Sequence, residues 1–124
     1  MTLETRESRD VHLEVPARPG YLVLARLALS AICRLTPLEH NEVADLKLAV
    51  TEAASHFVAD DRDADVVVEF TFRLSDNQLE MELRGTPTDA PEDEKELSRA
   101  IVEATVDKAE LNSGRAVLVK QLPA

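Results

Sequence analysis

Several residue types are scarce in this chain of 124 residues, and each shortage excludes a class of protein. The single cysteine, Cys33, cannot form a disulfide within the chain, and no Cys/His spacing typical of a zinc site is present. Cys33 is either a redox group or, as is commoner for a buried helical cysteine, a small apolar side chain. Aromatic residues make up only 3% of the sequence, so we expect a core of aliphatic side chains.

Basic residues are few compared with acidic ones. The chain has 14 Lys and Arg against 24 Asp and Glu, which gives a formal net charge of −10. This charge argues against nucleic acid or an anionic membrane as a direct partner. The longest apolar run, residues 21–35, contains Arg26 and is too short to span a bilayer. The polar first residues show no secretory signal, and a free cysteine suits a reducing compartment, so we expect a cytoplasmic protein.

Apolar periodicity predicts one α+β domain over residues 11–124, preceded by a flexible tail over residues 1–10. Alternation predicts strands at residues 11–15, 66–74, 78–84 and 115–122. Helical spacing predicts helices at residues 20–35, 36–60 and about 93–108. This order of elements predicts a two-layer sandwich, in which three helices cover one face of a mostly antiparallel mixed sheet.

The expected helix over residues 36–60 has a clear start signal. Thr36 can act as its cap, and Glu39 follows three residues later, so the sequence Thr-Pro-Leu-Glu predicts a capping box. Further along, Glu52 and His56 are four residues apart and are expected on one helical face. A carboxylate and an imidazole at this spacing serve catalysis or metal binding, or form a solvated polar edge, which is the commoner case.

The expected helix over residues 20–35 is apolar nearly all round, so it must be buried on more than one side. One sheet covers only one of those sides. The rest packs either on the second helix or on another molecule, and both alternatives remain open. Arg26 is the one charge inside the apolar run, where it acts either as a solvent-facing group or as a contact residue.

Two motifs, together with the order of elements, resemble bacterial anti-sigma factors of the serine-kinase type. The motifs are V-P-A-x-P before the first helix and D-L-K-L-A-V-T-E-A in the second. Such proteins belong to the histidine-kinase-like ATPase superfamily, which includes gyrase, Hsp90, histidine kinases and MutL. The resemblance covers about residues 11–122 and implies a shortened version of that fold.

The resemblance also implies partners. Members of the family hold a sigma factor away from RNA polymerase, form dimers, and use Mg²⁺-ATP to phosphorylate an anti-sigma factor antagonist on a serine or threonine. An arginine at the place of Arg26 contacts both protein partners in the family. By that resemblance Arg26 is the expected contact residue here, together with Tyr21, Leu22 and Leu29 on the same helix.

The ATP site that the resemblance implies has three parts, and all three depart from the family pattern. In the first part, E-x-x-x-N, Glu52 matches the general base, whereas His56 replaces the asparagine that helps to hold Mg²⁺. Imidazole is a poor ligand for this hard cation. In the second part, D-x-G-x-G, the positions are Gly85, Pro87 and Asp89. The carboxylate that would bind adenine is therefore missing, and a glycine is replaced by a residue without an N–H.

The third part, G-x-G at the start of the third helix, falls on Glu96 and Ser98. A carboxylate at this place repels a triphosphate, whose oxygens would otherwise meet backbone N–H groups. We therefore expect a regulator that binds a sigma factor or an antagonist by contact, with no cofactor and no metal. The alternatives are an active serine/threonine kinase that uses Glu52 as its base, and a dimerisation or scaffold module that inherited only the fold.

Overall fold

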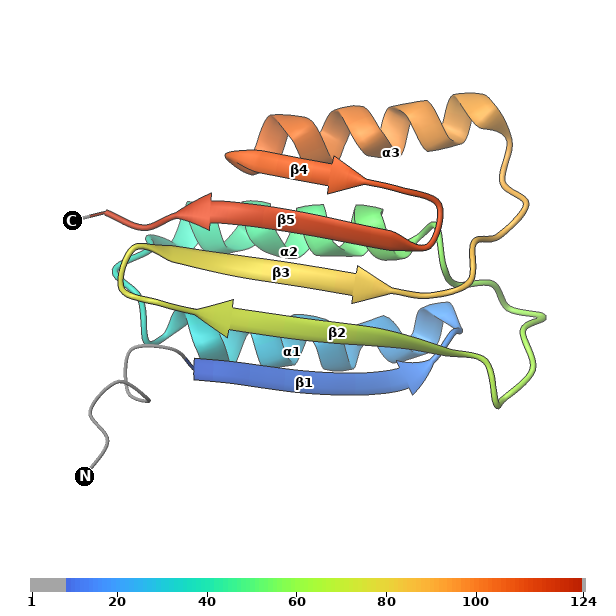
Figure 1. Ribbon diagram of the computed structural model, residues 1–124, viewed down its shortest axis with the longest axis horizontal. Coiled ribbons are helices and arrows are strands. Elements are labelled where there is room, and N and C mark those ends of the chain that lie inside the picture. The colour runs from blue at the N-terminus through green and yellow to red at the C-terminus, as the bar shows by residue number, and fades with distance from the viewer. Residues whose placement is uncertain (1–8, 124) are drawn as a thin grey trace.

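The computed structural model describes residues 9–123, which form a sheet with helices against one face (Figure 1). The strands of this part of the chain are β1 (Arg9–Pro16), β2 (Val67–Leu74), β3 (Gln78–Arg84), β4 (Lys108–Leu111) and β5 (Arg115–Gln121). Its helices are α1 (Leu22–Cys33), α2 (His40–Ala54) and α3 (Glu92–Thr105), with a 3₁₀ turn at Pro19–Tyr21 before α1.

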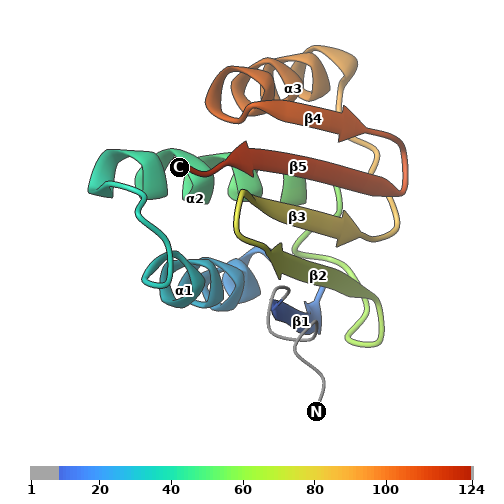
Figure 2. The ribbon, with the colours of Figure 1, turned by 60° about the vertical axis from the view of Figure 1, so that its left-hand side comes forward.

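The sheet has the strand order β1-β2-β3-β5-β4, and every neighbouring pair in residues 9–123 is antiparallel. The predicted α+β sandwich is confirmed, although the sheet is not mixed. The helices α1 and α2 lie on the same side of the sheet, and α3 packs beside α2 and runs along β4 (Figure 2). This arrangement places the ends of α2 and β3 and the start of α3 at one end of the molecule.

Alternation along the strands builds the core. The helix-facing residues of β2 are at most 4% exposed, and the rings of Phe70 and Phe72 stack with their centroids 6.4 Å apart. Leu79, Met81 and Leu83 of β3 continue this layer. The core is aliphatic apart from the three phenylalanines, all of which are buried.

Several predicted boundaries are wrong. Helix α2 begins at His40, with Glu39 as its N-cap and Glu42 completing the capping box, so Thr36 does not start it. Helix α3 ends at Thr105, and Lys108, where the predicted third helix ends, begins β4, a short strand that pairs with β5 across the turn at residues 112–114. Of the predicted tail, residues 1–8 lie outside the described residues, and Arg9 and Asp10 belong to β1.

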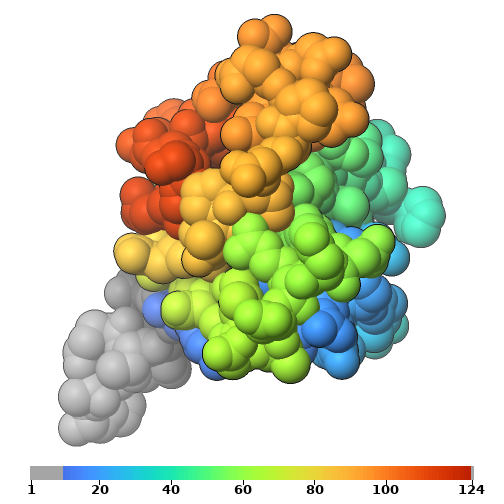
Figure 3. Space-filling model, turned by 90° about the vertical axis from the view of Figure 1, so that its right-hand side faces the viewer, coloured from blue at the N-terminus to red at the C-terminus, as the bar shows by residue number. Residues whose placement is uncertain are grey.

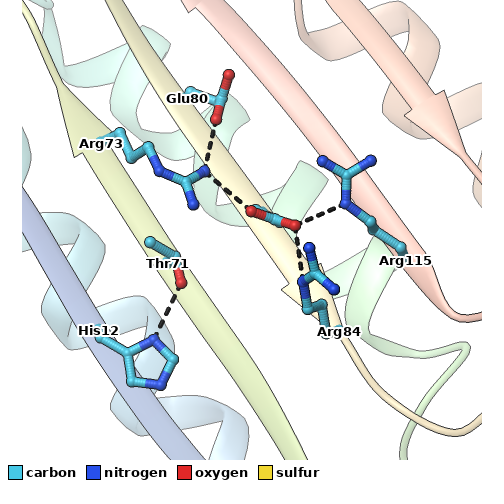
Figure 4. Close-up of polar contacts among 7 residues, drawn as sticks. His12, Thr71, Arg73, Glu80, Arg84 and Arg115 are labelled. Atoms are coloured by element: carbon cyan, nitrogen blue, oxygen red, sulfur yellow. Dashed lines mark hydrogen bonds and ion pairs between the residues drawn. The ribbon is translucent and has the colours of Figure 1, made fainter.

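The sheet face that the helices leave uncovered carries a cluster of charges (Figure 4). The carboxylate of Glu82 accepts hydrogen bonds from Arg73 at 2.9 Å, Arg84 at 2.8 Å and Arg115 at 2.6 Å. Arg73 also donates to Glu80 at 2.7 Å. The three arginines come from β2, β3 and β5 and cover Glu82, so the side chain of Glu82 is only 5% exposed.

Within residues 9–123, none of the helices combines the length and apolar character needed to cross a membrane.

Candidate functional site at the end of α2

Glu52 lies in the last turn of α2, and His56 lies in the turn that follows it. The helix ends at Ala54, where tighter i→i+3 bonds, such as Phe57 N–H to the Ala54 carbonyl at 2.9 Å, replace the helical pattern. The prediction of one helical face that carries both Glu52 and His56 is therefore wrong, because the helix stops before residue 56. Both side chains nevertheless line the same cavity of about 310 Å³.

A hydroxyl of α3 meets the carboxylate of Glu52. The Ser98 Oγ donates to Glu52 Oε1 at 2.9 Å, and the Ser55 Oγ lies 3.5 Å from the same hydroxyl. The first and third parts of the expected ATP site therefore come together, and they do so through a direct contact between side chains. Glu96 is exposed and lines a neighbouring hollow of about 240 Å³ with His56 and other residues.

His56 is half-buried, and its surroundings favour the neutral ring. Burial and the positive charges of Lys95 and Arg99 lower the pKa of His56, and the nearby carboxylate of Glu52 opposes them. The backbone carbonyl of His56 accepts from the Thr88 N–H at 2.9 Å. A neutral imidazole with this environment neither neutralises a phosphate nor offers the oxygen ligand that Mg²⁺ prefers.

The segment between β3 and α3 is tied down by Arg62. The guanidinium of Arg62 donates to the carbonyls of Thr86 at 2.9 Å and Pro87 at 2.8 Å. Figure 3 shows the loop that carries Arg62 and the segment between β3 and α3 side by side at this end of the molecule. Asp89 is exposed and, like Pro87, lines a wide hollow of about 730 Å³ beside the Arg62 loop. Nothing in the sequence pattern singled out Arg62, because its role depends on two loops meeting.

Gly85 lies so close to Phe57 that a side chain at this position is disfavoured. A Cβ at this position would lie 3.0 Å from both the Cβ and the Cγ of Phe57, which is buried. The site therefore has no room for the family's aspartate without a shift of the core.

The charges at the start of α3 are unfavourable for a triphosphate. Acidic side chains of Glu92, Asp93 and Glu94 fill the first turn of α3, where they complement the helix dipole in place of a phosphate. Within residues 9–123, no group of three or more His, Cys, Asp or Glu side chains is placed to hold a metal ion.

A second candidate site lies on α1. Two of its four predicted residues are exposed and two are buried. Tyr21 and Arg26 are exposed, but Leu22 is 7% exposed and Leu29 is fully buried. Both Leu22 and Leu29 belong to the core, and their burial argues against a direct contact with a partner. The exposed apolar side chains beside Arg26 are Val23, Leu24 and Leu27.

Comparison with known proteins gives a consistent set of relatives. No protein-family model matches the chain. The serine-protein kinase RsbW of Bacillus licheniformis is 31% identical over 110 residues, which cover 83% of this chain and 67% of the relative. The RsbW of Listeria monocytogenes is 32% identical over 84 residues, 59% of this chain and 54% of the relative. That of Bacillus subtilis is 33% identical over 64 residues, 48% and 40% of the two chains.

The chain thus spans between two fifths and two thirds of the length of these relatives. Among solved structures, it resembles the crystal structure of the RsbU and RsbW domains of Rv1364c from Mycobacterium tuberculosis, with a TM-score of 0.66. The match has 22% sequence identity and covers 94% of this chain and 34% of the other, so it supports the fold. The resemblance that the sequence motifs indicated is confirmed by these relatives.

Proposed function

Since the chain belongs to the RsbW family of serine-protein kinases, we propose that it regulates transcription as an anti-sigma factor without using ATP. In this proposal it binds a sigma factor, an anti-sigma factor antagonist, or each in turn, by direct contact through α1. Such a role places it in the cytoplasm with its partners.

The observation that carries this proposal is the exposed face of α1. Tyr21, Val23 and Leu24 are between 43% and 44% exposed, and Leu27 is 60% exposed, although all four are large apolar side chains. Arg26 stands among them, and no ion pair to it is found within residues 9–123. An apolar surface around an unpaired arginine is the composition typical of an interface centre.

The proposal omits ATP because of contacts at the end of α2. Ser98 already donates to Glu52, Arg62 holds the segment that follows β3, and Phe57 lies against Gly85. A nucleotide would have to break the first contact and displace the second. Binding energy spent on such rearrangement is lost from affinity.

The test is direct binding. The sigma factors and antagonists encoded in the source genome are produced singly and titrated against the chain by calorimetry. We expect one to bind, and Arg26→Glu or Leu27→Ser to weaken that binding at least tenfold, about 1.4 kcal/mol. The matched control is Lys108→Glu, a charge reversal at an exposed residue of β4. Absence of any binding partner, or equal binding by Arg26→Glu, contradicts the proposal.

An active kinase is the second candidate, because Glu52 is kept and lines a cavity. In that case the chain would transfer phosphate from ATP to a serine or threonine of the antagonist. Incubation of the chain and antagonist with labelled ATP separates the two candidates. Label on the antagonist that disappears with Glu52→Gln would favour the kinase.

We also propose that the chain forms a homodimer. Its exposed leucines extend beyond α1, to Leu48 of α2 and Leu97 of α3, and the resemblance implies dimers. Sedimentation at micromolar concentration is expected to show a species of about twice the 13.7 kDa chain mass. A single species at the mass of one chain would refute this for the protein alone.

A further inference from the structure

A hollow of about 540 Å³ lies between the C-terminal half of α1 and the N-terminal half of α2. Ser30, Cys33 and Arg34 form its α1 wall, and His40, Val43 and Lys47 form its α2 wall. Figure 2 shows the loop between these two helices reaching out past the sheet. The hollow is separate from the site at the end of α2.

The hollow is basic in a protein that is otherwise acidic. Arg34 and Lys47 are cations, His40 adds an imidazole, and no acidic residue is among its lining residues within the described chain. Within residues 9–123, no ion pair is found for any of the three. The sequence has no acidic residue between Glu14 and Glu39, although the whole chain carries a net charge of −10. This part of the surface therefore attracts negative charge.

Glu42, two residues after His40, is engaged elsewhere. The Glu42 carboxylate accepts from the Glu39 N–H at 3.0 Å in the capping box and lies 3.5 Å from Lys120. Glu42 therefore serves the start of α2 and the end of the sheet. The cations of the hollow are left for an outside anion.

The floor of the hollow is apolar, which strengthens a charge pair formed there. Cys33 is only 4% exposed, and burial raises the pKa of its thiol, with the positive charge of Lys47 acting in the opposite direction. The thiol is thus neutral at neutral pH and sits near the Lys47 ammonium. Val43 packs against the core beside it. An ion pair above such a floor is less screened than one in open water.

The hollow continues the proposed contact face of α1. Arg26, Ser30 and Arg34 are spaced four residues apart, so they form one stripe along the helix. Eight residues of helix correspond to about 12 Å. A protein segment that contacts Arg26 and runs along this stripe therefore reaches the hollow.

We propose that the hollow receives a carboxylate side chain from an acidic segment of the protein partner that docks on α1. The inference rests on the proposed function, because it takes α1 to be the docking face. A carboxylate on a docked partner suits the hollow better than a free anion does. The capping box already bonds the N–H groups of Glu39 and Glu42 at the start of α2, and a tethered carboxylate, unlike a free ion, benefits from a high effective concentration.

The experiment uses the sigma factor or antagonist that binds the full chain. Arg34→Gln/Lys47→Gln should weaken binding at least tenfold and reduce its dependence on salt, because two cations of the interface are removed. Lys47→Arg should keep most of the affinity, since the charge is retained. Lys108→Gln, which removes a charge on β4, is the control and should leave binding unchanged. Circular dichroism checks that each variant is folded.

A double-mutant cycle then identifies the partner group. Acidic residues of the partner are changed singly to Asn or Gln and measured against Lys47→Gln. We expect one of them to show non-additivity of at least threefold, and no such coupling with Lys108→Gln.

The outcomes separate this inference from the proposed function. If Arg26→Glu weakens binding but Arg34→Gln/Lys47→Gln does not, the hollow is no subsite and the proposed function stands. Absence of coupling between Lys47 and every partner carboxylate also overturns the inference. If the chain binds no sigma factor and no antagonist, the proposed function fails and this inference fails with it.

Discussion

Glu82 carries its carboxylate on the sheet face without helices, and yet three arginines shield it from water. The hydrogen bond from Arg115 lowers its pKa most, burial opposes this, and Arg73 and Arg84 lower it further, so the pKa falls from 4.5 to about 2. A carboxylate whose pKa is lowered by folding stabilises the folded state at pH values above the pKa that it has in the unfolded chain. That stability is lost as the pH falls from about 4.5 towards 2.

Glu82→Gln should therefore lower the free energy of unfolding by about 1–3 kcal/mol at neutral pH. The difference from the parent should shrink as the pH falls below about 4.5, because the parent then protonates Glu82 itself. Urea denaturation between pH 7 and pH 2.5 measures this. Glu80→Gln removes one partly exposed contact to Arg73 and should cost less than about 1 kcal/mol. Equal costs for the two variants at neutral pH would contradict the special position of Glu82.

Gly85 is a second residue whose surroundings give a definite expectation. Gly85→Ala should destabilise the fold by about 1–3 kcal/mol, because its Cβ would lie 3.0 Å from Phe57. Gly20→Ala is the matched control, since nothing lies within 4 Å of a Cβ there. The control should be neutral or slightly stabilising, because alanine restricts the unfolded chain. Chemical denaturation compares the two, and an unchanged Gly85→Ala variant would show that Phe57 moves freely.

At the scale of the elements, α2 shows how two nearby start signals compete. Thr36 does not open α2, because its hydroxyl donates to the Cys33 carbonyl at 2.7 Å and accepts from the Leu38 N–H. It therefore closes α1. Glu39 and Glu42 make the capping box instead. The motif at Thr36 looked like a helix start because sequence alone does not tell which of two neighbouring helices a hydroxyl serves.

Glu42→Ala should accordingly cost about 0.5–2 kcal/mol, because α2 loses half of its capping box and Lys120 loses a partner. Asp45→Ala on the same helix is exposed and should change stability by no more than about 0.5 kcal/mol. Thermal and urea unfolding provide the values. If Thr36→Ala had the cost expected for Glu42→Ala, and Glu42→Ala had none, the assignment of the cap would be wrong.

Strand β4 and the site show which parts of the structure a sequence pattern predicts. The alternation in β2, β3 and β5 is strong, because one face of each is buried, and these strands were predicted closely. The sequence Lys-Ala-Glu-Leu of β4 consists of good helix formers and becomes a strand only by pairing with β5. The hydrogen bond from Ser98 to Glu52 and the hydrogen bonds from Arg62 to the segment after β3 likewise depend on packing between distant segments. Glu52 and Ser98 were named from the sequence and Arg62 was overlooked, and in neither case does the sequence pattern indicate the contact.

On the scale of the whole molecule, contacts between distant segments hold together the elements around the end of α2. The helix that carries Glu52 and the helix that carries Ser98 are bonded to each other. The segment after β3, which carries Pro87, is held by Arg62. At the other end of the helix layer, α1 exposes apolar side chains, and a hollow without acidic lining residues lies between α1 and α2.

Thermal unfolding with and without millimolar Mg²⁺-ATP tests this division for the whole protein. A site filled at about 100 times its dissociation constant would add about 2.7 kcal/mol, a rise in Tm on the order of 10 °C for a domain of this size. We expect no rise, because each missing hydrogen bond to a charged group costs roughly 1.5–3 kcal/mol. Three such losses, at Gly85, Pro87 and His56, sum to roughly 4.5–9 kcal/mol, which is comparable with the whole binding free energy of roughly 6 kcal/mol of a site of tens of micromolar. Mg²⁺ with inorganic phosphate at equal ionic strength is the control for salt effects. A clear rise with Mg²⁺-ATP alone, abolished by changing Glu52 and His56 to Ala, would mean that the nucleotide site works and that the kinase alternative is correct.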